Sequence, residues 1–257
     1  MRQHKAVLQF FIRSSMGSFL VLMSAMVLTE GFWFYRTVQK MLQLREQTGE
    51  IVLMTSEVVF DEAHLMIFFG YAVLILTAIL SVVGRNGTGH QDYTLYRLSV
   101  SPKSIFVWQT VCNVGYLLLL WFVQVILAFG LCQYYIEVAD AAAVTHQSLF
   151  LAFYRSPFLH GILPLQNFWC FVRNVMYFAA MGSVLAYEVY CSRRGKNRMW
   201  ISWILLYFGL SKFQVDLSDH AYTYGAEVAV YAIVLVVIGC ITLVWGEWKL
   251  DEAANKQ

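Results

Sequence analysis

Long apolar stretches without a charged residue dominate this sequence. Residues 65–84, 104–136 and 228–246 contain no Asp, Glu, Lys or Arg. A transmembrane helix needs roughly 20 such residues. The composition agrees, because 13% of the residues are charged, whereas an ordinary soluble domain has about 25%. These runs predict an all-α polytopic membrane protein.

Three further apolar runs are interrupted by ionisable residues. The first contains Glu30, the second contains Arg173 and Glu188, and the third contains Lys212. We therefore expect one transmembrane domain, 1–257, in a cell membrane of bacterial type. Its six spans are predicted at about 17–35, 65–83, 105–131, 165–190, 199–215 and 228–246. The first is expected to be a retained span, because no small-x-small cleavage site follows it.

The polar intervals are too short for a second domain. The longest, near 36–64 and 137–160, are far below the roughly 100 residues that a soluble catalytic domain needs. The chain also has no GxxxxGK[ST], HExxH or GxSxG motif, so ATP binding or hydrolysis within this chain is not expected. Its 18 basic residues are too few and too scattered for nucleic acid. We expect a protein that is not an enzyme.

The distribution of Lys and Arg predicts the orientation. With six spans, twelve of these residues lie on the side of the termini and five on the other side, while Arg173 lies within a span. The positive-inside rule then places both termini in the cytoplasm. Ten acidic residues lie on the opposite side, including Asp61, Glu62 and Asp216.

Two cytoplasmic segments carry patterns of their own. Residues 1–16 place Arg2, Lys5, Gln9 and Arg13 on one helical face, which predicts an amphipathic helix on the inner leaflet. Alternatively, these charges merely orient the first span. In the loop 84–104, glycines end the second span and Pro102 begins the third. The segment between them is either a compact helix that docks a partner or a solvated turn.

At this loop the chain resembles the membrane subunits of ABC exporters of the ABC-2 kind. The resemblance lies in Gly87-Thr88, Tyr93-Thr94-Leu95 and Ser101-Pro102-Lys103 ahead of a long third span, together with the order of the spans. Leu98-Ser99 replaces a Leu-Pro dipeptide of many relatives, which indicates a divergent subfamily. In this family the loop forms a coupling helix that sits in a groove of the ATPase subunit.

The resemblance implies that this chain works with partner subunits. The chain would be a permease subunit that pairs with a second, identical or homologous permease subunit in the lipid bilayer. Two separate ATPase subunits would bind ATP and Mg²⁺, so this chain would need no cofactor. The residues expected to contact the ATPase are Asp92, Tyr93, Tyr96, Arg97 and Lys103.

The exported substrate expected from the family is a drug, a peptide or a lipid-like molecule. A different class of function stays open, in which the chain is a non-transporting assembly or immunity protein that binds a partner through its outer loops. Ion-coupled secondary transport is less favoured, because no acidic residue is predicted at mid-membrane.

Polar residues within the spans are candidates for a translocation cavity. They are Glu30, Gln124, Arg173 and Lys212. The ionisable ones are predicted at the outer ends of their spans, where they either snorkel to the interface or line a cavity. Because Glu30, Arg173 and Lys212 share this depth, we hypothesise that at least one pair of them interacts.

No metal centre or disulfide framework is indicated. The five cysteines are far apart and form no CxxC, although Cys132 and Cys170 both lie near the predicted outer face. Four histidines, His64, His146, His160 and His220, lie on the outer side with several acids, but their spacing is too loose for a defined metal site. We expect the cysteines to be packing residues and no bound metal.

Overall fold

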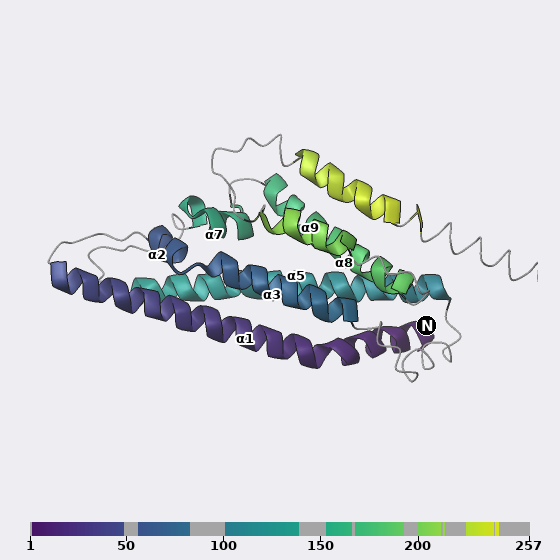
Figure 1. Ribbon diagram of the computed structural model, residues 1–257, viewed down its shortest axis with the longest axis horizontal. Helices are drawn as coiled ribbons and strands as arrows, with labels where there is room; N and C mark the ends of the chain where they lie inside the picture. The colour runs from purple at the N-terminus through teal and green to yellow at the C-terminus, as the bar shows by residue number, and fades with distance from the viewer. Residues whose placement is uncertain are drawn as a thin grey trace, which may run out of the picture.

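The protein is an α-helical bundle in the computed structural model (Figure 1). The structure describes residues 2–48, 56–82, 101–138, 153–165, 168–192, 200–211, 213, 225–238 and 240–241. The labelled helices are α1 Arg2–Thr48, α2 Ser56–Glu62, α3 Leu65–Val82, α5 Pro102–Val138, α7 Pro157–Ile162, α8 Phe168–Ser192 and α9 Trp200–Ser211. An apolar helix, Gly225–Ile238, follows α9.

Four of these helices, α1, α3, α5 and α8, are long and apolar enough to cross a membrane. The predicted helical fold is thus confirmed for the described residues, and its apolar helices are compatible with a multi-pass membrane protein. The other two predicted spans correspond to shorter apolar helices, α9 and Gly225–Ile238. The 12 residues of α9 are about 18 Å long, which is less than the roughly 30 Å of a hydrocarbon layer.

Consecutive large helices run in opposite directions. Trp33 contacts Phe68 and Phe34 contacts Phe60, so α1 and the α2–α3 region are antiparallel. Phe19 contacts Tyr116 and Tyr35 contacts Tyr134, which makes α1 and α5 parallel. The starts of α1 and α5 therefore lie at the same end of the molecule (Figure 1).

The second half of the chain continues this alternation. The side chain of Asn113 on α5 reaches Gly182 on α8, and Trp121 contacts Phe171, so α5 and α8 are antiparallel. Glu188 contacts the start of α9 at Ser202, so α9 runs against α8. The helix Gly225–Ile238 runs with α8, since Glu227 and Tyr231 contact Arg173 and Tyr177.

α1 and α5 are much longer than a membrane span. Their 47 and 37 residues correspond to about 70 Å and 55 Å. The predicted interfacial helix 1–16 and the predicted span 17–35 are parts of one continuous helix that extends to Thr48. The sequence 36–48 has no Gly or Pro to end it.

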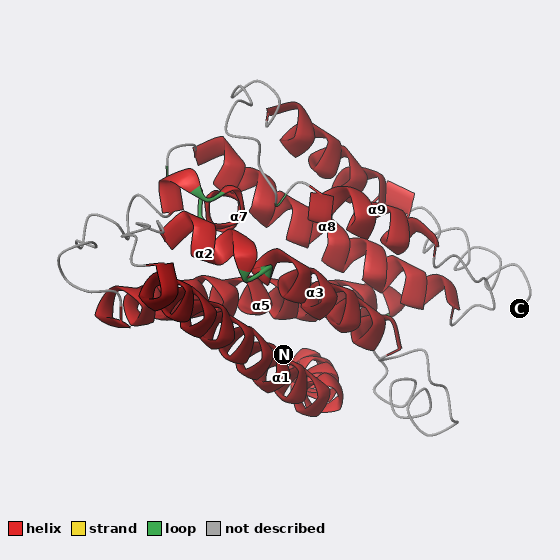
Figure 2. Cartoon of the chain, turned by 60° about the vertical axis from the view of Figure 1, so that its left-hand side comes forward, coloured by secondary structure: helices red, strands yellow, loops and turns green. Residues whose placement is uncertain are grey.

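α2 and α7 lie side by side at the opposite end of the bundle from the start of α1 (Figures 1 and 2). Ser156, just before α7, donates to Asp61 of α2 at 3.5 Å. α7 is buried, with Phe158 against Phe69 of α3. Trp121 Nε1 of α5 donates to the Ile162 carbonyl at 3.0 Å. Aromatic packing and backbone hydrogen bonds thus hold this end together.

Candidate functional site

A buried polar pair links the two longest helices. Glu30 on α1 and Gln124 on α5 are both fully buried, and the amide nitrogen of Gln124 lies 2.7 Å from Oε2 of Glu30. The parallel packing of α1 and α5 brings these two residues together, although 94 positions separate them in the sequence. Two of the four residues predicted to line a cavity are therefore direct neighbours.

Contacts between α1 and α3 give the level of Glu30 along the bundle. Glu30 precedes Trp33 by three residues, and Trp33 contacts Phe68 on the antiparallel α3. Because the helices are antiparallel, three residues before Trp33 correspond to three residues after Phe68, so Glu30 lies level with about residue 71. A helix rises about 1.5 Å per residue, which puts this level roughly 9 Å from the first residue of α3. α1 itself continues to Thr48, beyond the predicted end of the first span near residue 35.

Arg173 lies in a second polar cluster. Its guanidinium donates to Oδ1 of Asn174 at 2.9 and 3.2 Å and lies 3.8 Å from the carboxylate of Glu227. The Asn174 amide in turn donates to the Gly161 carbonyl of α7 at 2.7 Å. The cluster therefore ties α8 to α7 and to the helix Gly225–Ile238.

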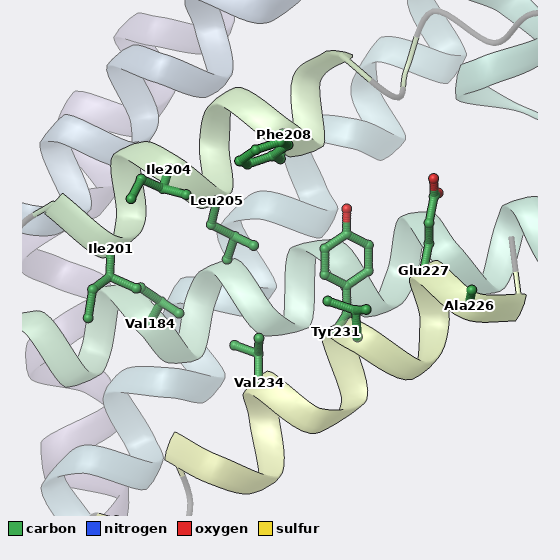
Figure 3. A pocket seen from close by; sticks show the side chains of 10 residues that line it. Val184, Ile201, Ile204, Leu205, Phe208, Ala226, Glu227, Tyr231 and Val234 are labelled. Carbon is green, nitrogen blue, oxygen red and sulfur yellow. The ribbon is translucent and has the colours of Figure 1, made fainter. Parts of the chain in front are cut away.

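An apolar pocket lies beside this cluster, between α8, α9 and Gly225–Ile238 (Figure 3). Its volume is about 540 Å³, within the range of small-molecule sites. The lining residues are Val184, Ile201, Ile204, Leu205, Phe208, Ala226, Glu227, Val230, Tyr231 and Val234. Glu227 and Tyr231, one helical turn apart, supply its polar groups, and all others are apolar.

This pocket opens on a surface suited to lipid. Ile204, Phe208 and Val230 line it and are also 48%, 60% and 56% exposed. Apolar exposure of this kind, in a bundle with four helices long and apolar enough to cross a membrane, suits contact with acyl chains. The geometry can therefore hold an apolar chain or ring, with a polar group near Glu227 and Arg173.

At the other end of the bundle, the start of α1 packs on the start of α5. Val7 and Phe11 form a buried cluster with Cys112, and Trp108 Nε1 donates to His4 Nδ1 at 3.2 Å. Lys103 and Ser104 border a small hollow with His4 and Trp108. The other residues predicted to contact an ATPase, Asp92, Tyr93, Tyr96 and Arg97, lie outside the described residues.

The structure separates the remaining cavity candidates. Glu30 has Gln124 as its partner, whereas Arg173 contacts Asn174 and Glu227. Lys212 lies outside the described residues. Sequence reasoning did not single out Glu227 and Tyr231. Their i, i+4 spacing at the start of an apolar run placed them on one face, but their partners come from distant helices.

The cysteines and histidines form no disulfide and no metal-binding group in the part of the chain that the structure describes. All five cysteines are free thiols, and four of them are buried, so Cys132 and Cys170 are not joined. Among the described residues, no group of three or more His, Cys, Asp or Glu could hold a metal ion. His146 and His220 lie outside those residues.

Comparisons with protein families, with curated proteins and with solved structures found no match.

Proposed function

We propose that this chain is the permease subunit of an ATP-driven exporter of the ABC-2 kind. It would form the translocation path with a second permease subunit, and separate ATPase subunits would supply the energy. The proposal combines the resemblance around residues 87–105 with a helical multi-pass chain whose longest polar intervals are too short for an ATPase domain.

The observation that carries this proposal is the brace between α1 and α5. His4, Val7 and Phe11 pack on the first turns of α5, directly after the proposed coupling loop. The Tyr116 hydroxyl also donates to the Ile12 carbonyl at 3.1 Å. A force applied to the loop by an ATPase would therefore move α5 and α1 together.

The alternating helix directions support six spans with both termini in the cytoplasm. α1, α5 and α9 run one way, while α3, α8 and Gly225–Ile238 run the other way. This order returns the chain to its starting side after Gly225–Ile238. The two short helices would then be the described parts of spans five and six.

Among the substrates expected for the family, the pocket favours a lipid-like amphiphile. Eight of its ten lining residues are apolar, and Glu227 and Arg173 lie together at one end. Such a lining suits an apolar tail with a polar head. A strongly hydrophilic peptide would find few partners there.

Co-purification tests this proposal. The tagged chain is extracted from the membranes of its own host in mild detergent, and an ABC ATPase with a P-loop motif is sought by mass spectrometry. We expect co-purified ATPase activity in the unchanged chain. Replacing Tyr96 and Arg97 by Ala should lower its recovery about tenfold or more, since hot-spot side chains contribute about 2 kcal/mol.

The matched control is Tyr71→Ala, which removes an exposed tyrosine from α3. It should leave ATPase recovery unchanged. Recovery of the chain without an ABC ATPase, together with unchanged ATP-dependent export in the Tyr96 and Arg97 variants, would contradict the proposal. Retention of a different partner that depends on the outer loops would favour an assembly or immunity protein instead.

A further inference from the structure

The buried pair of Glu30 and Gln124 contains acceptor atoms that form no hydrogen bond. Besides the 2.7 Å contact between them, Oε1 of Glu30 and Oε1 of Gln124 are buried without a hydrogen-bond partner. Buried polar atoms in native structures are nearly always paired. Two neighbouring orphan oxygens in the interior of a bundle therefore indicate a missing positive or hydrogen-donating ligand.

The elements around Glu30 offer no countercharge. α3 contains no Asp, Glu, Lys, Arg or His, and the charged residues of α5, Lys103 and Glu137, lie near its two ends. On α1, the Arg36 side chain is exposed and lies over the Phe32 ring. Arg173 on α8 contacts Asn174 and Glu227. Within the described part of the chain, Glu30 forms no ion pair.

A carboxylate in these surroundings would be strongly disfavoured. Burying an ionised group without a partner costs far more than burying a neutral, hydrogen-bonded one. A charged acid at the centre of a membrane helix costs about 2.5–3.5 kcal/mol even on insertion scales. The neutral carboxylic acid avoids this cost.

The missing ligand is small. Ions such as Na⁺ or Ca²⁺ need several oxygen ligands, about six to eight for Ca²⁺. The described site offers two oxygen atoms that have no hydrogen-bond partner. One proton on the carboxyl group needs one acceptor. The 2.7 Å separation between Gln124 Nε2 and Glu30 Oε2 lies within the ranges of both N–H···O and O–H···O bonds, so it would suit either donor.

Gln124 suits both protonation states. Its amide nitrogen can donate to a carboxylate, and its amide oxygen can accept from a carboxylic acid after the amide rotates by half a turn. The two orientations place nitrogen and oxygen in nearly the same positions. No movement of the helices is needed to exchange one state for the other.

We propose that Glu30 and Gln124 form a proton-binding site in the interior of the bundle, in which the neutral Glu30 acid hydrogen-bonds to Gln124 and joins α1 to α5. The ligand is a proton. The proton leaves a hydronium ion of the solvent and adds to a carboxylate oxygen of Glu30, and no bond within the protein breaks. This inference does not depend on the proposed exporter function.

Infrared spectroscopy on the full chain in lipid bilayers tests the site. A protonated carboxyl group gives a C=O stretching band above the amide bands, and its position depends on hydrogen bonding. At neutral pH we expect such a band in the unchanged protein and its loss in Glu30→Gln. Gln124→Leu should shift the band to higher frequency, because the hydrogen bond is removed.

Glu188→Gln is the matched control, since Glu188 is another buried acid of a spanning helix. It should leave the Glu30 band in place. Identical carbonyl spectra of the unchanged protein and Glu30→Gln at neutral pH would overturn the proposal. If Glu30→Gln does not fold, the Gln124→Leu shift decides the question in a chain that retains the acid, and no shift overturns the proposal.

Stability against pH gives a second readout. Above about pH 4.3 an unfolded Glu has released its proton, whereas the folded protein would still hold it. Stability should then fall as pH rises, because the folded state binds more protons than the unfolded state. Glu30→Gln should remove this part of the pH dependence. An unchanged slope in that variant would contradict the site, and Gln133→Leu, an exposed amide change on α5, should leave the slope unaltered.

Discussion

Glu188 shows how a single acidic residue in an apolar helix can be structural. It is 3% exposed, and its Oε1 accepts a hydrogen bond from the backbone N–H of Ser202 at 2.8 Å. Ser202 is the third residue of α9, so this N–H has no partner within its own helix. Glu188, which lies on α8, therefore caps the N-terminus of a different helix, α9.

We expect Glu188→Ala to lower the free energy of unfolding by about 1 kcal/mol, as loss of a helix cap does. Glu188→Gln keeps an oxygen acceptor and should cost less. Thermal unfolding of the purified protein in one detergent compares the two variants. Equal stability of Ala and Gln variants would show that the cap contributes nothing.

Buried His160 predicts that the stability of the protein depends on pH in mild acid. It lies in α7, outside the spanning helices, and is 5% exposed. Burial lowers the pKa of His160, a backbone hydrogen bond at Phe153 raises it, and the Arg173 charge lowers it; the net direction is down. The fold therefore favours neutral histidine, whereas the unfolded chain takes up a proton near pH 6.5.

The contribution of neutral His160 to the free energy of unfolding is complete above about pH 6.5. It declines as the pH falls below that value. We expect the unchanged protein to lose up to about 1.4 kcal/mol per pH unit more than His160→Gln over this range. Unfolding midpoints measured near neutral pH and in mild acid would show the difference. Parallel curves for the two proteins would exclude this role.

The sequence singles out several polar positions that are buried in the structure, but not their partners. Glu30, Gln124 and Arg173 were candidates because each interrupts an apolar run. The contact of Glu30 with Gln124 rather than with Arg173 depends on the parallel packing of α1 on α5. One sequence carries no record of which helix faces meet, so such pairings could not be predicted.

At the scale of elements, close contact between α5 and α8 depends on Gly182. A Cβ added there would lie 2.6 Å from Cγ2 and 2.8 Å from the nitrogen of Val114. The Gly182 carbonyl also accepts from the Asn113 amide at 3.3 Å. Small residues recur at helical spacing along this part of α8, at Ala179, Gly182, Ser183 and Ala186, and Gly182 lies in a close contact with α5.

We expect Gly182→Ala to destabilise the protein by about 1–3 kcal/mol, because the two backbones must separate. Gly115→Ala is the matched control, since nothing lies within 4 Å of its Cβ position. On an α-helix this second change should be neutral or stabilising, by up to about 1 kcal/mol. Unfolding in a denaturing detergent measures both, and similar effects of the two changes would refute the packing argument.

Apolar runs predicted the existence of the main helices better than their ends. α3, Leu65–Val82, closely matches the predicted 65–83. α1 continues for 13 residues past Tyr35, because the sequence there becomes more polar but still favours a helix. The sequence 36–48 consists largely of helix formers such as Met41, Leu42 and Leu44. Hydropathy reports the membrane boundary, which need not be the end of the helix.

At the scale of the whole molecule, the bundle has two chemically different ends. At one end, buried aromatic residues join α2 to α1 and α7 to α3. The other carries the start of α1, the start of α5 and the end of α3 (Figure 1). In the proposed orientation, twelve Lys and Arg lie on this second side, where an ATPase would bind.

Cysteine labelling of whole cells tests this orientation. In a variant without the native cysteines, single cysteines replace Ser99 in the proposed coupling loop, Ser148 in the proposed outer loop and Lys256 at the C-terminus. We expect a membrane-impermeant maleimide to label Ser148→Cys in intact cells. Ser99→Cys and Lys256→Cys should react after the membrane is opened. If Lys256→Cys and Ser99→Cys instead react on opposite sides, the number of spans is odd, and α9 or Gly225–Ile238 does not cross. The two short helices are therefore the elements on which the side of the C-terminus depends.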